Sequence, residues 1–255
     1  MKVLAIALNT SREAIRNRIL YSIVFFAVVV ACIAAVFGAA SVGDHMKFVK
    51  DFSLMSISLF GVIIAITLGV NLLNKELGKK TIFNILSKPV SRWQFILGKF
   101  AGLLATLVVV VTLMCAGLIA IAWSLDNHFD WGLVLASGTA LLELMVITSI
   151  ALFFSAGVVT PTLAGLFTAA AFVAGRSAKY LRYFWSNEHS AGVQSLAHSL
   201  YWIIPHLDQF NISDLVVYGN VVQLRYVVTI AAYAVGYSTV MLALSVAFFT
   251  RREFV

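Results

Sequence analysis

Long apolar runs dominate this chain, and they restrict its fold more than any other feature. Of its 255 residues, 61% are hydrophobic and 11% are charged, whereas a soluble domain carries about 25% charged residues. Each apolar run approaches the ~20 residues that a helix needs to cross a bilayer. The sequence therefore predicts an all-α polytopic membrane protein with about six transmembrane helices, organised as a single permease domain over residues 1–255.

The expected spans are separated by short polar loops, with one exception on the outer side. They cover residues 19–40, 53–73, 95–123, 132–158, 161–175 and 226–249. Pro161 suits the first position of a helix, because no hydrogen-bonding N–H is lost there. The fifth run is short for a span, and it leads into an outer loop over 176–225 with an interfacial or re-entrant helix over 193–204. The aromatic residues of this loop are typical of a membrane-interface belt, and a substrate-contacting lid is the alternative.

The charged residues outside the spans indicate how the chain is oriented. Residues 1–18 mix arginines with apolar residues, which predicts an amphipathic helix in the membrane interface that carries Arg12 and Arg16. If the amino terminus is inside, twelve of the eighteen lysine and arginine residues fall on the inner side. The positive-inside rule therefore predicts that both termini are cytoplasmic.

One long polar segment, residues 74–93, interrupts the early apolar runs on the predicted cytoplasmic side. It encloses a short amphipathic helix expected over 81–86, which Pro89 brings to an end. Ser91 and Gln94 then form a capping-box pattern, which predicts the start of a new helix. A short amphipathic helix on a basic loop offers a surface that a partner protein can bind.

The same segment resembles the cytoplasmic loop of ATP-binding-cassette permeases of the type 2 exporter class. The resemblance rests on Glu76, Thr81, Leu86, Lys88-Pro89-Val90-Ser91-Arg92 and Lys99. Residues 7–20 and 204–211 resemble the first amphipathic segment and the last outer loop of these permeases. The nearest likeness is to the group that serves multi-copper-enzyme maturation, including that of nitrous oxide reductase. The resemblance implies a homodimeric exporter permease in a prokaryotic cytoplasmic (inner) membrane, paired with two copies of a cytoplasmic ABC ATPase.

The resemblance also implies which residues couple ATP hydrolysis to transport. The expected coupling residues are Glu76, Thr81, Phe83, Leu86, Pro89 and Arg92. The helix around Arg12 and Arg16 would brace the same surface. The chain lacks the G-x-x-x-x-G-K-[ST] phosphate loop, so it is expected to hold no cofactor, with ATP and Mg²⁺ bound by the partner ATPase. A periplasmic accessory protein is a further candidate partner, and the substrate stays open among lipid, peptide, drug and copper- or sulfur-linked species.

Two features within the spans are candidates for function. Glu143 is the one ionisable residue in the middle of an expected span, which makes it a candidate intramembrane polar site. Three interpretations are open: a carboxyl hydrogen-bonded to a neighbouring helix, a substrate or gating contact, and a proton relay. Small residues recur every four positions in the first span, at Ala27, Ala31, Ala35 and Ala39. Such a face permits close packing, either within one chain or in a permease dimer.

Other functional classes have less support in the sequence. Neither H-E-x-x-H nor G-x-S-x-G is present, so an enzyme is not expected. The five histidines lack H-x-H spacing, so they are interpreted as interfacial loop residues, with a metal site as the alternative. The net charge of +7 fits membrane orientation better than nucleic-acid binding. An ion-coupled secondary transporter or channel-like protein is the alternative function.

Overall fold

The computed structural model describes residues 2–40, 45–78, 91–126, 130–157, 160–180, 192, 195, 198–199, 201, 204–220 and 222–251. Its main elements are α1 (Lys2–Ile15), α2 (Arg18–Ala40), α3 (His45–Gly78), α5 (Arg92–Asp126), α6 (Trp131–Gly157), α7 (Pro161–Arg176), the 3₁₀ helix η1 (Leu207–Phe210), α10 (Ser213–Val217) and α11 (Leu224–Arg251). No strand occurs in this part of the chain, which confirms the all-α prediction.

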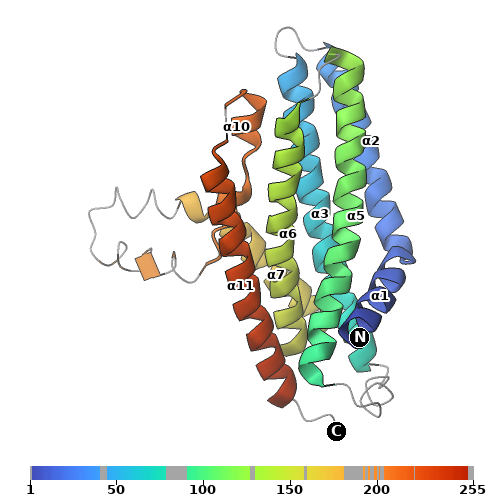
Figure 1. Ribbon diagram of the computed structural model, residues 1–255, viewed down its shortest axis with the longest axis vertical. Helices are drawn as coiled ribbons and strands as arrows, with labels where there is room; N and C mark the ends of the chain where they lie inside the picture. The colour runs from blue at the N-terminus through green and yellow to red at the C-terminus, as the bar shows by residue number, and fades with distance from the viewer. Residues whose placement is uncertain are drawn as a thin grey trace.

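The long helices form a bundle in which α3, α5 and α6 make the centre (Figure 1). On one side α2 packs against α3, and α1 packs against α5. On the other side α11 covers α6, while α7 contacts both α6 and α3. The start of α1 and the end of α11 lie toward the same end of the bundle. Buried leucine, isoleucine and valine side chains of α3, α5 and α6 fill the space between these helices.

Four described helices are long and apolar enough to cross a membrane, judged by length and composition. They are Met46–Leu72, Arg92–Ser124, Trp131–Gly157 and Leu224–Thr250. These helices match the second, third, fourth and sixth expected spans. A shorter apolar helix, Arg18–Val30, lies within α2, and α7 has only 16 residues. The first and fifth spans, and with them the total of six, stay predictions.

The second span is longer than the sequence indicates. Residues before 53 were expected in an outer loop because they are rich in charge, but α3 already begins at His45. Val49 is fully buried, and the ammonium group of Lys50 donates a hydrogen bond to Asp130 over 2.8 Å. Because Asp130 compensates the Lys50 charge and Val49 is buried, α3 can extend through residues 45–52, which are polar by composition.

Helix α1 lies within residues 1–18, where an interfacial helix is predicted, and glycines of α5 bring it close to the bundle. A Cβ added at Gly102 would lie 2.5 Å from the carbonyl oxygen of Ala7, and one at Gly98 would lie 2.7 Å from the Cβ of Ile6. Thr10, on the same side of α1, is fully buried. Small residues at such positions permit close helix packing, so α1 lies directly on the α5 backbone.

Parts of two predicted segments lie outside the described residues. These are the amphipathic helix over 81–86 and most of the helix expected over 193–204. Within the predicted outer loop, the described residues include the short elements η1 and α10. The turn after α10 contains Gly219, whose φ of 71° lies in the left-handed region that glycine adopts without a steric cost.

Candidate functional site

Helix α7 carries one side of the candidate site at its carboxyl end. Pro161 occupies its first turn, as predicted, and the helix ends at Arg176. A helix of 16 residues rises about 24 Å, which is less than the ~30 Å of a bilayer core. The helix therefore stops within the bundle, and Arg176 lies opposite the middle of α6.

A later part of the predicted outer loop, residues 205–207, closes against this end of α7. A Cβ added at Gly175 would lie 2.6 Å from the carbonyl oxygen of Pro205 and 2.7 Å from the Cγ atom of Leu207. The approach of another backbone at this distance requires a residue without a side chain. Leu207 is fully buried at this contact. Residues 205–207 therefore hold the end of α7 in place.

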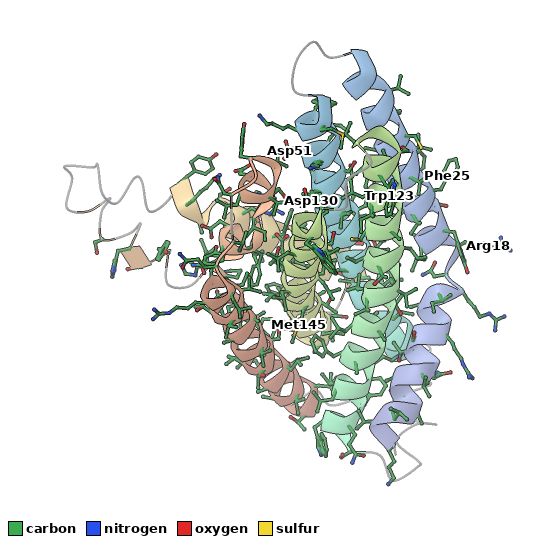
Figure 2. The ribbon with its side chains drawn as sticks, turned by 45° about the horizontal axis from the view of Figure 1, so that its top comes forward. Arg18, Phe25, Asp51, Trp123, Asp130 and Met145 are labelled. Atoms are coloured by element: carbon green, nitrogen blue, oxygen red, sulfur yellow. The ribbon has the colours of Figure 1, made fainter. Side chains whose placement is uncertain are left out.

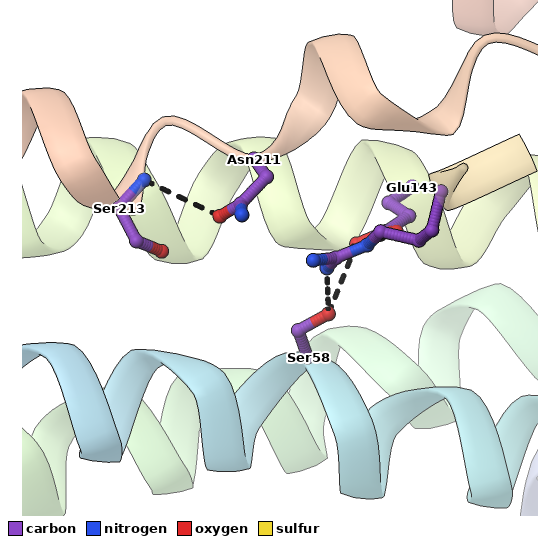
Figure 3. Close-up of polar contacts among 5 residues, drawn as sticks. Ser58, Glu143, Asn211 and Ser213 are labelled. Carbon is purple, nitrogen blue, oxygen red and sulfur yellow. Dashed lines mark hydrogen bonds and ion pairs between the residues drawn. The ribbon is translucent and has the colours of Figure 1, made fainter. Parts of the chain in front are cut away.

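Arg176 pairs with Glu143, the predicted intramembrane polar residue of α6 (Figure 3). Its Nε donates to Glu143 Oε1 over 2.8 Å, and its Nη2 donates to Oε2 over 3.0 Å. Ser58 of α3 completes the cluster. The Ser58 hydroxyl accepts from Arg176 Nη2 over 2.6 Å and donates to Glu143 Oε2 over 3.0 Å. One polar cluster thus joins α3, α6 and α7.

Burial makes this pairing necessary. The Glu143 side chain is 1% exposed, whereas the Arg176 side chain is 29% exposed. Removing a charge from water costs several kcal/mol unless a partner compensates for the lost hydration. The two parallel hydrogen bonds from the guanidinium group provide the strongest geometry for a carboxylate. Glu143 therefore has the contacts of a carboxyl bonded to neighbouring helices, and a substrate or gating role for it stays a proposal.

A cavity of about 340 Å³ lies beside the ion pair. It is lined by Asp51, Leu54, Met55, Ser58, Leu59, Phe172, Arg176, Asn211 and Ser213. Its walls are partly apolar, and the Phe172 ring lies 5.7 Å from the Arg176 guanidinium carbon. Within the described residues, no group accepts a hydrogen bond from Arg176 Nη1. The cavity combines apolar walls with a few polar groups, which is the usual composition of a small-molecule site.

The predicted coupling residues are only partly within the described structure. Thr81, Phe83, Leu86 and Pro89 lie outside it, and Glu76 lies in the last turns of α3 with a side chain that is not described. Arg92 begins α5, where the backbone N–H of Ser91 donates to the Gln94 side chain over 3.3 Å. This bond is one of the two that the capping-box pattern predicts.

Arg92 connects the beginning of α5 to the end of α11. Its Nη1 donates to the carbonyl oxygens of Phe249 and Thr250 over 2.8 and 2.9 Å. The last carbonyl groups of a helix lack partners within the helix, and a guanidinium group near them is also favoured by the helix dipole. The Phe95 and Phe249 rings stack nearby at 5.8 Å. Both ends of this contact belong to candidate membrane spans.

The remaining predicted residues lie on α1 and α2. Arg12 and Arg16 are exposed at the end of α1. Ala27 is 1% exposed and packs inside the chain, whereas the side chains of Ala31, Ala35 and Ala39 are not described. The structure therefore assigns Ala27 to internal packing, and the dimer face stays a proposal.

The comparisons with known proteins identify the family. Residues 4–254 match the family described as ABC-2 family transporter protein. The chain belongs to the ABC-2 transporter family. No curated protein matches the chain. Because the match covers nearly the whole sequence, the bundle as a whole is the membrane component of an ABC transporter, which accords with the absence of an enzymatic motif.

Among the described residues of this ABC-2 family member, no group of three or more His, Cys, Asp or Glu side chains gathers. His128, His189 and the His45 side chain lie outside those residues, so the interpretation of the histidines stays a prediction. His206 packs among aromatic rings. Its ring lies 4.2 Å from that of Tyr201, and its Nδ1 lies 3.5 Å from the Tyr233 hydroxyl. Burial lowers the pKa of the His206 imidazole, and the nearby Asp208 opposes this shift.

Sequence reasoning missed Arg176 as the partner of Glu143. It counted Arg176 with the outer loop, because a fifth span was expected to bring the chain out of the membrane there. Two signals could have placed it inside. A run of 15 to 16 residues is too short to cross, so a charge at its end remains at depth. A carboxylate in mid-span also requires a partner, and a nearby arginine is the usual one.

Proposed function

We propose that this chain is the permease subunit of an ATP-driven exporter and that a separate cytoplasmic ATPase drives it by docking on residues 74–93. ABC-2 family membership supports a permease of this kind. The chain contains no phosphate-binding loop, so the energy for transport has to arrive through contact with another protein. In this proposal Glu76, Thr81, Phe83, Leu86 and Pro89 form the contact, with Phe83 as its aromatic anchor.

The observation that carries the proposal is the link from Arg92 to α11. Residues 74–93 connect the end of α3 to the start of α5, and Arg92 bonds the start of α5 to the last carbonyls of α11. A displacement of the loop would therefore act on three helices at once. Helix α1 packs against the same part of α5 through Gly98 and Gly102 and would brace it.

The cavity beside Arg176 is the place where this movement would meet the substrate. Helices α3 and α7 both line it, and α3 also leads into the loop. A shift of α3 relative to α7 would change the distance between Ser58 and Arg176 and so the shape of the cavity. We propose that Glu143 acts here as a gating residue, because it holds Arg176 against α6.

The proposed assembly is a homodimer of permeases with two ATPases in a prokaryotic cytoplasmic membrane, with both termini inside. The start of α1 and the end of α11 lie at one end of the bundle, which supports placing both termini on the same side of the membrane. The excess of lysine and arginine on that side supports the cytoplasmic side. The likeness of residues 74–99 to copper-maturation permeases makes a copper- or sulfur-linked substrate, with a periplasmic accessory protein, one candidate. Lipids, peptides and drugs are the others.

The test separates recruitment of the ATPase from coupling. The permease is co-expressed with a candidate cytoplasmic ABC ATPase, purified, and reconstituted in liposomes for ATP turnover. Phe83→Ala should reduce the amount of co-purified ATPase, because it removes the main apolar contact. Arg92→Gln should retain the ATPase but lower the turnover that depends on the permease, because Arg92 contacts α11 within the chain.

Phe25→Ala is the matched control, since Phe25 is 64% exposed on α2 and its side chain projects away from the bundle (Figure 2). It should behave as the wild type. Normal recruitment and normal turnover in both Phe83→Ala and Glu76→Ala would contradict the docking proposal. Transport by the purified chain alone, driven by an ion gradient, would replace it with the secondary-transporter alternative.

A further inference from the structure

A second cavity, separate from the one at Arg176, lies where α1 meets α2. It has a volume of about 780 Å³ and is lined by Asn9, Arg12, Glu13, Arg16, Asn17, Arg18, Asn71 and Leu72. The chain bends here, since the N–H of Asn17 donates to the Ala14 carbonyl and the Asn17 side chain caps α2 at the N–H of Ile19. The bend brings the end of α1 and the start of α2 around one groove.

The groove has a strongly positive lining. Its described lining contains three guanidinium groups, those of Arg12, Arg16 and Arg18, and one carboxylate, that of Glu13. No described residue forms an ion pair or side-chain hydrogen bond with any of the three guanidinium groups. Figure 2 shows the Arg18 side chain extending away from the bundle. Guanidinium groups bind phosphate oxygens through pairs of parallel hydrogen bonds, so this lining suits a phosphate.

The groove lies at the depth where an apolar helix surface gives way to polar residues. Asn71 and Leu72 are the last residues of the apolar stretch Met46–Leu72 of α3. Beside the arginines, α1 exposes a stripe of apolar side chains. They are Leu4, Leu8 and Ile15, which are 67%, 52% and 38% exposed. An exposed apolar stripe on an amphipathic helix is typical of a surface that contacts acyl chains or another apolar surface.

We propose that this groove binds the headgroup of an anionic phospholipid. The arginines contact the phosphate, and the acyl chains cover the stripe of Leu4, Leu8 and Ile15. Basic pockets between membrane helices on the cytoplasmic side are known binding sites for anionic headgroups. The neighbouring apolar stripe favours a lipid over a soluble protein, because a water-exposed docking surface would leave that stripe in water. The proposal does not depend on the direction of transport or on the ATPase.

The test measures lipid retention by the full-length chain in detergent, using native mass spectrometry. The probes are phosphatidylglycerol and phosphatidylcholine with identical acyl chains, and inorganic phosphate as a competitor. The wild type should retain phosphatidylglycerol preferentially. Arg12→Gln/Arg16→Gln should weaken that retention by about tenfold or more, since each basic residue near an anionic surface contributes about 1 kcal/mol.

The matched control is Lys179→Gln/Arg225→Gln, which removes two charges from exposed residues that do not line the groove. It should retain the preference for phosphatidylglycerol.

Equal retention by Arg12→Gln/Arg16→Gln and the wild type would overturn the proposal, and so would an equal loss in the control. Full displacement of the lipid by inorganic phosphate at the same concentration would also overturn it. If the groove variant keeps its lipid but loses the ATPase, the groove is a protein-binding surface instead. The residues changed in the two double variants are all exposed, so the size-exclusion profiles of both variants should match that of the wild type.

Discussion

Helices α1 and α7 are similar in length, at 14 and 16 residues, yet they place their arginines in opposite environments. Helix α1 lies on α5 at one end of the bundle and leaves Arg12 and Arg16 exposed. Helix α7 packs between α3 and α6 and directs Arg176 toward a carboxylate that is 1% exposed. Both helices are too short to cross a bilayer.

The difference shows that helix length alone does not assign a role to a terminal arginine. Within the described residues, no carboxylate forms an ion pair with the exposed arginines of α1, so their guanidinium groups are available to a ligand from the membrane. On α7 the partner is Glu143, and the helix end is held by residues 205–207. Removing a charge should therefore cost little stability on α1 and much at the α7 end.

The largest effect is expected at Glu143. Glu143→Ala would leave Arg176 without its partner, and breaking a buried ion pair costs about 3–5 kcal/mol. Because the Arg176 side chain is 29% exposed to the cavity, we expect a loss of about 3 kcal/mol, at the lower end of that range. The measurement is the unfolding free energy in mixed micelles by denaturant titration.

Two comparisons make the Glu143 result interpretable. Asp51→Asn removes a carboxylate that lines the same cavity and has no ion pair among the described residues, so its effect should stay within about 0.5 kcal/mol. A double-mutant cycle of Glu143→Gln with Arg176→Gln should give a coupling energy of about 1–3 kcal/mol. Additive effects of these two substitutions would mean that the ion pair contributes no stability.

The contact of α1 with α5 should show the next largest effect. Gly102→Ala places a Cβ 2.5 Å from the Ala7 carbonyl oxygen, so α1 has to move. Overpacking of this kind costs about 1–3 kcal/mol. Gly117→Ala, in the same helix with nothing within 4 Å of the new Cβ, is the control and should stabilise through helix propensity. Equal thermal midpoints for the two variants would show that α1 is not held by this contact.

Much of the fold is predictable from the sequence because apolar runs determine where helices can lie. The runs predict α5, α6 and α11 closely, and Pro161 marks the first residue of α7. The beginning of α3 was harder to predict. Residues 45–52 are polar by composition, and their helical state depends on contacts with residues far along the chain, such as Lys50 with Asp130.

The candidate site could be predicted only in part for a related reason. Glu143 is conspicuous in the sequence because a carboxylate in mid-span is costly. Its partners Ser58 and Arg176 come from positions 85 and 33 residues away, and no local pattern connects them. Arg92 was predicted from its loop as a coupling residue, whereas its bond to the end of α11 depends on the packing of two distant helices.

The ion pair of Lys50 and Asp130 is intermediate in exposure between the arginines of α1 and the pair of Arg176 and Glu143. Its side chains are 17% and 32% exposed. Burial opposes ionisation of Asp130, but the Lys50 hydrogen bond, the Gly132 N–H and the Lys50 charge together hold the pKa of its carboxyl below the ordinary 3.8. A lowered folded-state pKa means that the ionised carboxylate stabilises the protein above pH 3.8. This stabilisation is lost as pH falls below that value through the folded-state pKa.

Lys50→Met tests this smallest effect. The wild type should exceed the variant in unfolding free energy by less than about 1 kcal/mol at pH 5–8, as partly exposed pairs do. The difference should narrow below pH 3.8, where Asp130 takes up its proton. Asp130→Asn should remove the same pH dependence. Lys47→Met, three residues earlier on α3, controls for the loss of a lysine on that helix. A difference that stays constant down to pH 3 would mean that Lys50 acts through packing of its methylene groups rather than through its charge.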